Sequence, residues 1–218
     1  MTIQAEAMNL LPVIVCVVGV VGLLMAERSD RRQGVWLFKP IAASAYVWAA
    51  LSWGALESTY GRWLLLGLVL CWFGDVLLIP KDRRSWFKVG IIAFLGGHLA
   101  YITAFLQVPI GLFGLAVGNL VAGLLVLFVW TWLGPKLSAE YRRLVAIYVI
   151  VICGMLVAAF AAADGTGRVA IAIGAAMFAL SDVSVARDRF VTKAFVNRAW
   201  GLPLYFGAQL LLASTVAV

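Results

Sequence analysis

The sequence has few charged residues. Asp, Glu, Lys and Arg make up 12% of its 218 residues, whereas 64% are hydrophobic and the mean hydropathy is +1.02. A soluble domain carries about 25% charged residues, because water must solvate its surface. The shortage of charge therefore excludes a soluble globular domain. It predicts an all-α, polytopic integral membrane protein with a single membrane-embedded domain over residues 1–218.

Histidine and cysteine are also scarce. The only histidine is His98, and Cys16, Cys71 and Cys153 lie in separate hydrophobic runs without a Cys-x-x-Cys motif. A zinc site needs three or four protein ligands, and a disulfide framework needs cysteines that can pair. The sequence predicts neither, and we expect no metal and no cofactor. An ion held between two carboxylates stays an open alternative.

Charged residues divide the chain into long uncharged runs. Residues 89–135 contain no charge and are long enough for two helices of ~20 residues with a break near Pro109. Because lipid offers no hydrogen-bond partners to the backbone, such runs must be helical. The runs predict eight transmembrane helices, at residues 7–26, 40–56, 63–80, 89–108, 112–133, 144–163, 169–186 and 199–217.

The basic residues are concentrated around every second loop. Fifteen of the 17 Lys and Arg lie around the loops that follow the first, third, fifth and seventh spans, and only Arg62 and Arg168 lie at the opposite end. The positive-inside rule places the basic loops in the cytoplasm and both termini outside. This topology explains the net charge of +7, so the charge does not indicate nucleic-acid binding. The high Ala, Val and Gly content and the lack of sorting motifs indicate a bacterial inner membrane.

Two aspartates interrupt the hydrophobic runs, Asp75 in CWFGDVLLIP and Asp182 in FALSDVSVARDRF. Each lies five or six residues before a basic residue, so both carboxyls are expected ~8–9 Å below the cytosolic boundary. A carboxylate there is costly unless it is paired, protonated or hydrated. A structural hydrogen bond is one interpretation of each. If the two face each other, they can instead share a proton and supply a general acid and a base in one site.

The surroundings of the two aspartates also resemble each other. Asp75-Val76 precedes Lys-Asp-Arg, and Asp182-Val183 precedes Arg-Asp-Arg, four spans later and in the same direction. This similarity suggests a parallel repeat of two four-helix halves about an axis normal to the membrane. Chance similarity between helix ends is the alternative.

Further polar residues lie in the predicted spans. His98 and Tyr101 are three residues apart in the fourth span, and Tyr205 and Gln209 are four apart in the eighth, so each pair shares a helix face. Each is either a hydrogen-bonded core residue or part of a site. Lys39 begins the second span, where it either reaches back to the interface or contacts a phosphate.

Taken together, these residues resemble the YhhN-like lysoplasmalogenase family of eight-span membrane proteins. No single motif is specific, but their order and spacing over spans two to eight are. Asp188 departs from the family pattern, in which we expect Asn before Arg189-Phe190. The resemblance rests on Lys39-Pro40, Gly74-Asp75, Gly97-His98 with Tyr101, Tyr148, Phe178, Ser181-Asp182, Arg189-Phe190, and Leu202-Pro203-Leu204-Tyr205 with Gln209.

The resemblance implies a reaction, the hydrolysis of the vinyl ether bond of lysoplasmalogens to a fatty aldehyde and glycerophospho-choline or -ethanolamine. The substrate would be a lysophospholipid from the bilayer. A vinyl ether is cleaved by protonating its outer alkene carbon, which leaves an oxocarbenium ion that water attacks. Glycosidases use an acid and a carboxylate for a similar transition state.

We therefore expect one of Asp75 and Asp182 to be the general acid and the other to stabilise the cation and activate water. The remaining candidates have supporting roles. Lys39 would meet the phosphate, and the residues expected to orient the carboxyls, the water or the substrate are His98, Tyr101, Tyr148, Ser181, Tyr205 and Gln209.

Two other functions stay open. A proton-coupled membrane transporter would also use paired carboxylates and a buried histidine, although the spans contain few helix breaks. An intramembrane aspartyl protease would use two aspartates on separate helices, but Trp72 stands where its G-x-G-D pattern needs glycine, and Leu202-Pro203-Leu204 only loosely matches its P-A-L turn.

Overall fold

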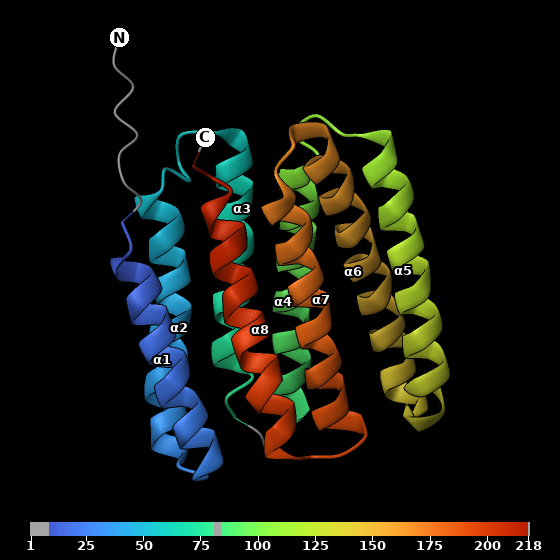
Figure 1. Cartoon of the computed structure of the whole chain (residues 1–218). Coiled ribbons are helices and arrows are strands. Elements are labelled where there is room, and N and C mark those ends of the chain that lie inside the picture. The colour runs from blue at the N-terminus through green and yellow to red at the C-terminus, as the bar shows by residue number, and fades with distance from the viewer. Residues whose placement is uncertain (1–8, 81–83, 218) are drawn as a thin grey trace.

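The protein is an all-α bundle of eight long helices, as the computed structural model in Figure 1 shows for residues 9–80 and 84–217. This part of the chain contains no β-strand. The predicted start of the first span at residue 7, residue 218, and the stretch Lys81-Asp82-Arg83 lie outside the described residues. The helices are α1 (Leu11–Arg28), α2 (Arg32–Ser52), α3 (Thr59–Leu77), α4 (Arg84–Phe105), α5 (Leu112–Trp132), α6 (Ala139–Thr166), α7 (Val169–Phe190) and α8 (Phe195–Ser214), with a 3₁₀ turn, η1, at Gly134–Lys136.

The helices suit a membrane environment. Seven of the described helices, α1 to α7, are long and apolar enough to cross a bilayer. Their outward faces carry large exposed apolar side chains, such as Ile14, Phe113 and Leu127, which lipid would cover. α8 is not among the seven, because it contains Arg198 and Gln209 among other polar residues. The polytopic helical bundle is thus confirmed, whereas an eighth span stays a prediction.

Several helix ends differ from the predicted spans. The largest difference is in α2, which was expected to begin at Pro40 but begins at Arg32 and continues through the proline. A proline inside a helix removes one N–H donor, and neighbouring helices in a membrane bundle compensate for that loss. Lys39 therefore lies inside the helix, about two turns from its start, and not at its first residue. α6 is likewise longer than the predicted 144–163.

Consecutive helices pack as antiparallel hairpins. The most extensive contacts join α1 to α2, α3 to α4, α5 to α6 and α7 to α8. Small residues allow the close approach of α3 and α4, because a Cβ on Gly67 would collide with the ring of Tyr101 and one on Gly97 would collide with Cys71 Sγ. α6 ends at Gly167, whose φ of +72° is a conformation that favours glycine.

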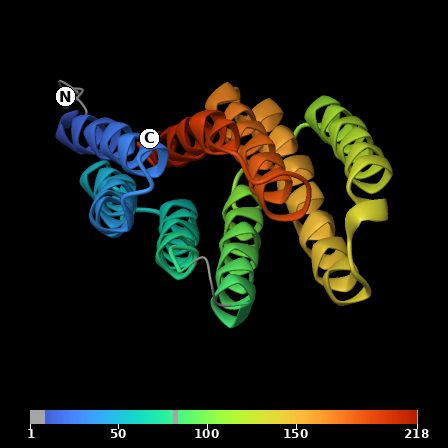
Figure 2. The same ribbon diagram turned by 90° about the horizontal axis from the view of Figure 1, so that it is seen from below.

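The described chain begins and ends at one end of the bundle, and α1, α3, α5 and α7 each finish at the other (Figure 1). Figure 2, seen from that second end, places the α1–α2 hairpin at one edge and α5 at the other, with α3, α4, α7 and α8 between them. The fold thus collects the basic loops at one end. Which end faces the cytoplasm stays a prediction.

The pattern of helix neighbours is similar in the two halves. α2 packs on α3 as α6 packs on α7, and α4 contacts α6 as α8 contacts α2. A parallel repeat of two four-helix units about an axis along the bundle produces such a pattern. The contact of α1 with α8 departs from it, since no contact of similar extent joins α5 to α4. The repeat itself stays a prediction.

Candidate active site

A cavity of about 500 Å³ is lined by residues from all eight helices and opens at the end of the bundle that carries the basic loops. Both Asp75 and Asp182 line it. Pockets of roughly 300–1,000 Å³ hold most small-molecule ligands. The fold therefore brings the two predicted carboxyls to one space of ligand size.

Asp75 lies near the end of α3 and is almost completely buried. Its Oδ2 accepts hydrogen bonds from the hydroxyls of Tyr46 in α2, at 3.0 Å, and Tyr205 in α8, at 2.7 Å. Lys39 Nζ lies 3.3 Å from Oδ1 and donates to the Asp75 carbonyl oxygen at 2.9 Å. Lys39 and Tyr46 are seven residues apart, so α2 presents both on one face. We call Asp75, Lys39, Tyr46 and Tyr205 the Asp75 cluster.

This arrangement stabilises the ionised form of Asp75. An ammonium group and two hydroxyl donors are directed at one carboxylate, and hydrogen bonds to a charged acceptor are stronger than those between neutral groups. The sequence predicted that Lys39 contacts a phosphate, but two of its interactions are with Asp75.

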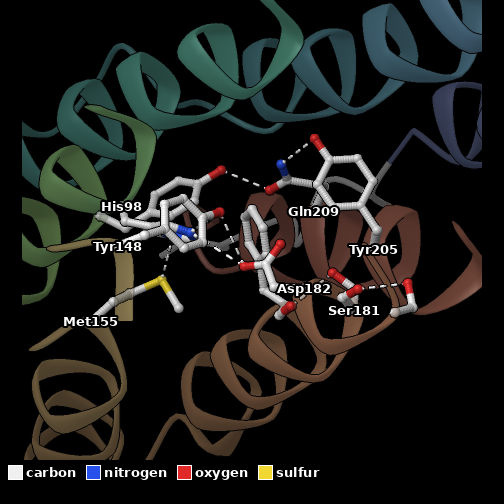
Figure 3. Close-up of polar contacts among 10 residues, drawn as sticks. His98, Tyr148, Met155, Ser181, Asp182, Tyr205 and Gln209 are labelled. Carbon is white, nitrogen blue, oxygen red and sulfur yellow. Dashed lines mark hydrogen bonds and ion pairs between the residues drawn. The ribbon is translucent and has the colours of Figure 1, made fainter. Parts of the chain in front are cut away.

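Asp182, in α7, has different partners. Its Oδ2 accepts a hydrogen bond from the Tyr148 hydroxyl of α6 at 3.2 Å and lies 3.5 Å from His98 Nε2 of α4. His98 Nε2 is 3.1 Å from the Tyr148 hydroxyl, and His98 Nδ1 is 3.2 Å from Met155 Sδ. Figure 3 shows these side chains converging. We call Asp182, His98, Tyr148 and Met155 the Asp182 cluster.

The two carboxyls differ in their access to the cavity. The Asp182 side chain is 18% exposed, whereas that of Asp75 is 3% exposed. Lys39 Nζ lies beside Asp75, whereas no Lys or Arg of the described residues forms an ion pair with Asp182. Asp182 is therefore the carboxyl that a bound molecule reaches more easily.

The clusters are adjacent but separate. No hydrogen bond links the two carboxyls within residues 9–80 and 84–217. The buried ring of Phe178 contacts both clusters, with its centroid 4.6 Å from the His98 ring and 5.2 Å from the Tyr205 ring. A proton shared directly between the aspartates stays a prediction that no contact supports.

Tyr101 and Gln209 extend the Asp75 cluster. The Tyr101 hydroxyl donates to Gln209 Oε1 at 2.7 Å, and Gln209 Nε2 donates to the Tyr205 hydroxyl at 3.0 Å (Figure 3). All three side chains are buried. Among the described residues, Tyr101 and Gln209 are thus connected to Asp75 through the Tyr205 hydroxyl.

Ser181 does not join either cluster. Its Oγ donates to the carbonyl oxygen of Phe178 at 2.7 Å, within the same helix. It lines the cavity next to Asp182, but its hydroxyl forms no bond to either carboxyl of the described chain. The structure brings together all the other predicted site residues.

Sequence reasoning missed Tyr46 and Met155. Tyr46 is fully buried and donates directly to Asp75. Its position seven residues after Lys39 was the available signal, since i and i+7 share a helix face. Met155 gave no signal, because a methionine in an apolar span is usually a packing residue.

The residues of the described ranges do not form a metal centre: no three His, Cys, Asp or Glu side chains in them come together as ligands would. The polar atoms of the two clusters instead satisfy one another. The groups that the two clusters present are carboxyls, hydroxyls, one imidazole and one ammonium group.

The sequence of the chain matches a known protein family. The model of the YhhN family matches residues 34–216. The chain belongs to the YhhN family. The matched range contains every residue of the Asp75 and Asp182 clusters.

Individual relatives of this YhhN-family protein are named as enzymes. It is 30% identical over 156 residues to "Lysoplasmalogenase TMEM86A" of Bos taurus, a match that covers 69% of this chain and 63% of the relative. It is 31% identical over 156 residues to the Homo sapiens protein of that name, with the same two coverages. It is 32% identical over 165 residues to "Lysoplasmalogenase" of Mycobacterium bovis, covering 70% of this chain and 59% of the relative.

These matches span less than two thirds of the length of each relative. No solved structure matches the chain.

Proposed function

We propose that this protein hydrolyses the vinyl ether bond of lysoplasmalogens, releasing a fatty aldehyde and a glycerophospho-base. The observation that carries the proposal is the pair of carboxyls on one cavity, one held beside a lysine and the other open. The names of the relatives support the same reaction. Vinyl ether cleavage needs a proton donor for carbon and a carboxylate near a developing cation, which are the two roles that these environments favour.

Asp182 is the general acid in this proposal. It is the more exposed carboxyl. Among the described residues, Tyr148 donates a hydrogen bond to it, and His98 Nε2 lies 3.5 Å away. Since Tyr148 donates to Oδ2, Oδ1 is the atom that carries the proton toward the cavity. That proton is transferred to the outer alkene carbon, which leaves an oxocarbenium ion and the Asp182 carboxylate.

Asp75 is the carboxylate that stabilises the cation and orients water. Lys39, Tyr46 and Tyr205 favour its ionised form and fix its position. Water, oriented by Asp75, adds to the oxocarbenium carbon and gives one proton to the Asp182 carboxylate, which restores the acid. The resulting hemiacetal loses its hydroxyl proton as the bond to the glycerol oxygen breaks, and that oxygen is protonated. One water is consumed, and the protein is unchanged.

The membrane placement is part of the proposal. The substrate enters from the bilayer, and the cavity mouth faces the cytoplasm, because the basic loops lie at that end. A bacterial inner membrane remains the expectation from composition.

The test is aldehyde release from a lysoplasmalogen by the purified protein in detergent. Wild type should release aldehyde, and Asp182→Asn should release far less. Asp30→Asn is the matched control, because Asp30 is a carboxylate that does not line the cavity, and its rate should equal that of wild type. A folded wild type that releases no aldehyde would contradict the proposal and favour proton-coupled transport.

A further inference from the structure

We propose that Arg189 and Lys193 form a phosphate-binding subsite at the mouth of the cavity, which holds the headgroup while the ether bond lies beside Asp182. The inference rests on the proposed function for the position of the ether bond. The chemistry that it assigns is recognition of a lysophospholipid phosphate by two cations.

The positions of the two cations fit this role. Both line the same cavity as Asp182, and both are exposed. The Arg189 guanidinium lies 4.3 Å from the centre of the Phe87 ring, a cation–π contact that fixes the side chain and leaves its N–H edges available. Lys193 is in the short loop between α7 and α8, directly at the mouth.

The other cations that line the cavity are already paired with carboxylates. Lys39 is beside Asp75. Arg198 is 3.1 Å from Glu27 and 2.7 Å from Asp188, and so joins α1, α7 and α8. Among the described residues, neither Arg189 nor Lys193 forms an ion pair with a carboxylate. These two are therefore the cavity cations with charge to offer an anion.

The spacing along α7 matches the substrate. Asp182 and Arg189 are seven residues apart, so they share one face of the helix and lie ~10 Å apart along its axis. In a lysophospholipid, five bonds separate the ether oxygen from phosphorus, which corresponds to roughly 6–7 Å in an extended chain, with the outer phosphate oxygens ~1.5 Å farther. The Arg189 side chain readily spans the remainder.

The α5 and α6 side of the cavity is apolar, as a binding surface for a hydrocarbon chain must be. Leu125 and Val129 of α5, with Val145, Val149 and Ile152 of α6, present apolar side chains to the cavity. A lysophospholipid with its phosphate at Arg189 and Lys193 would place its chain against this wall. The cavity thus offers cations, carboxyls and an apolar surface, which match the three chemical parts of the lipid.

The test separates phosphate recognition from hydrolysis. Binding to the protein in phosphate-free maltoside micelles is measured for two non-cleavable ligands, a 1-alkyl lysophosphocholine and the 1-alkylglycerol that lacks phosphate. Arg189→Gln/Lys193→Gln should weaken binding of the phosphate ligand at least ten-fold and leave the alkylglycerol unchanged. Arg143→Gln is the control, since Arg143 is exposed at the same end but does not line the cavity.

Three results would overturn the inference: equal loss for both ligands, the same loss in Arg143→Gln, or no loss. Lys193→Gln alone, in an exposed loop, should show a smaller loss and guards against misfolding of the double variant. Because the ligands are not cleaved, this result stands whether or not the protein hydrolyses lysoplasmalogens. If it does, the double variant should raise KM for the phospholipid substrate with kcat nearly unchanged, and the KM for 1-alkenylglycerol should not move.

Discussion

The two carboxylate clusters occupy corresponding places in the bundle but have different partners. Asp75 of α3 is approached by α2 and α8, and Asp182 of α7 by α6 and α4. Asp182 follows Asp75 by 107 positions, and Tyr205 follows His98 by the same interval. A tyrosine also contacts each aspartate: α2 supplies Tyr46 to Asp75, and α6 supplies Tyr148 to Asp182.

One difference between the clusters is the charge of Lys39. Seven residues before Tyr46, α2 has Lys39, whereas seven residues before Tyr148, α6 has Tyr141. An ammonium group therefore reaches Asp75, whereas the corresponding Tyr141 packs against Phe87 and Phe190. One scaffold thus holds a buried carboxyl beside a lysine and a more exposed carboxyl without one, the two environments on which the proposed vinyl ether hydrolysis depends.

The comparison is tested most strongly by removing each carboxyl in turn. Asp182→Asn should lower kcat for aldehyde release by about 10²–10⁴, the usual contribution of a general acid, with little change in Tm. Asp75→Asn should lower kcat by at least about 10² and also lower Tm, because Lys39 loses its carboxylate. Turnover and thermal unfolding in detergent measure both effects. Similar Tm values for the two variants would remove the distinction between the clusters.

Lys39 is the residue that distinguishes the surroundings of Asp75 from those of Asp182. Lys39→Met should destabilise the protein by about 3–5 kcal/mol, because it leaves the Asp75 carboxylate buried without its cation. Adding Asp75→Asn to Lys39→Met should recover part of that loss, since the pair is coupled. Unfolding of the two single variants and the double variant gives the coupling. Additive losses would contradict an ion pair between these residues.

Each cluster contains a tyrosine whose hydroxyl donates a hydrogen bond to the aspartate, so the two bonds can be compared directly. Tyr148→Phe removes the hydroxyl that bonds Asp182, and Tyr205→Phe the one that bonds Asp75. One such bond contributes about 0.5–1.5 kcal/mol, so each variant should lose up to ~10-fold in kcat. Gln209 donates to the Tyr205 hydroxyl, so a Gln209 substitution should lower kcat less in the Tyr205→Phe background than in wild type. Steady-state rates of the single and combined variants measure this.

The smallest effect is expected at Gln209, which touches neither carboxyl. Gln209→Leu removes the link between Tyr101 and Tyr205 and leaves the Tyr101 hydroxyl buried. It should lower Tm by a few degrees and kcat only a few-fold, and Gln209→Glu should recover part of the activity. A loss as large as that of Asp182→Asn would mean that Gln209 contacts the reacting atoms.

The sequence alone was enough to predict a helical membrane bundle and to single out the two aspartates as candidate site residues. A carboxyl inside an apolar run is costly, so Asp75 and Asp182 were visible as candidates without a structure. The helix ends were less visible, because Pro40 lies inside α2 and does not begin it. A proline signals a helix start only when nothing else supplies the missing contacts.

The partners of the aspartates could not be predicted in the same way. In a soluble protein, the apolar face of a helix identifies the core, but in lipid both the core face and the outer face are apolar. The burial of Tyr46, the pairing of Lys39 with Asp75 and the position of Phe178 between the clusters all depend on helix rotation. That information is tertiary, and only the structure supplies it.

Protonation of the alkene carbon by Asp182 is tested most directly by hydrolysis of a lysoplasmalogen in D₂O, with the released aldehyde analysed by mass spectrometry. Protonation of carbon by Asp182 predicts one deuterium on the carbon next to the aldehyde group, and a strong loss of this product in Asp182→Asn. Aldehyde without deuterium at that carbon, or undiminished labelled product from Asp182→Asn, would contradict the account.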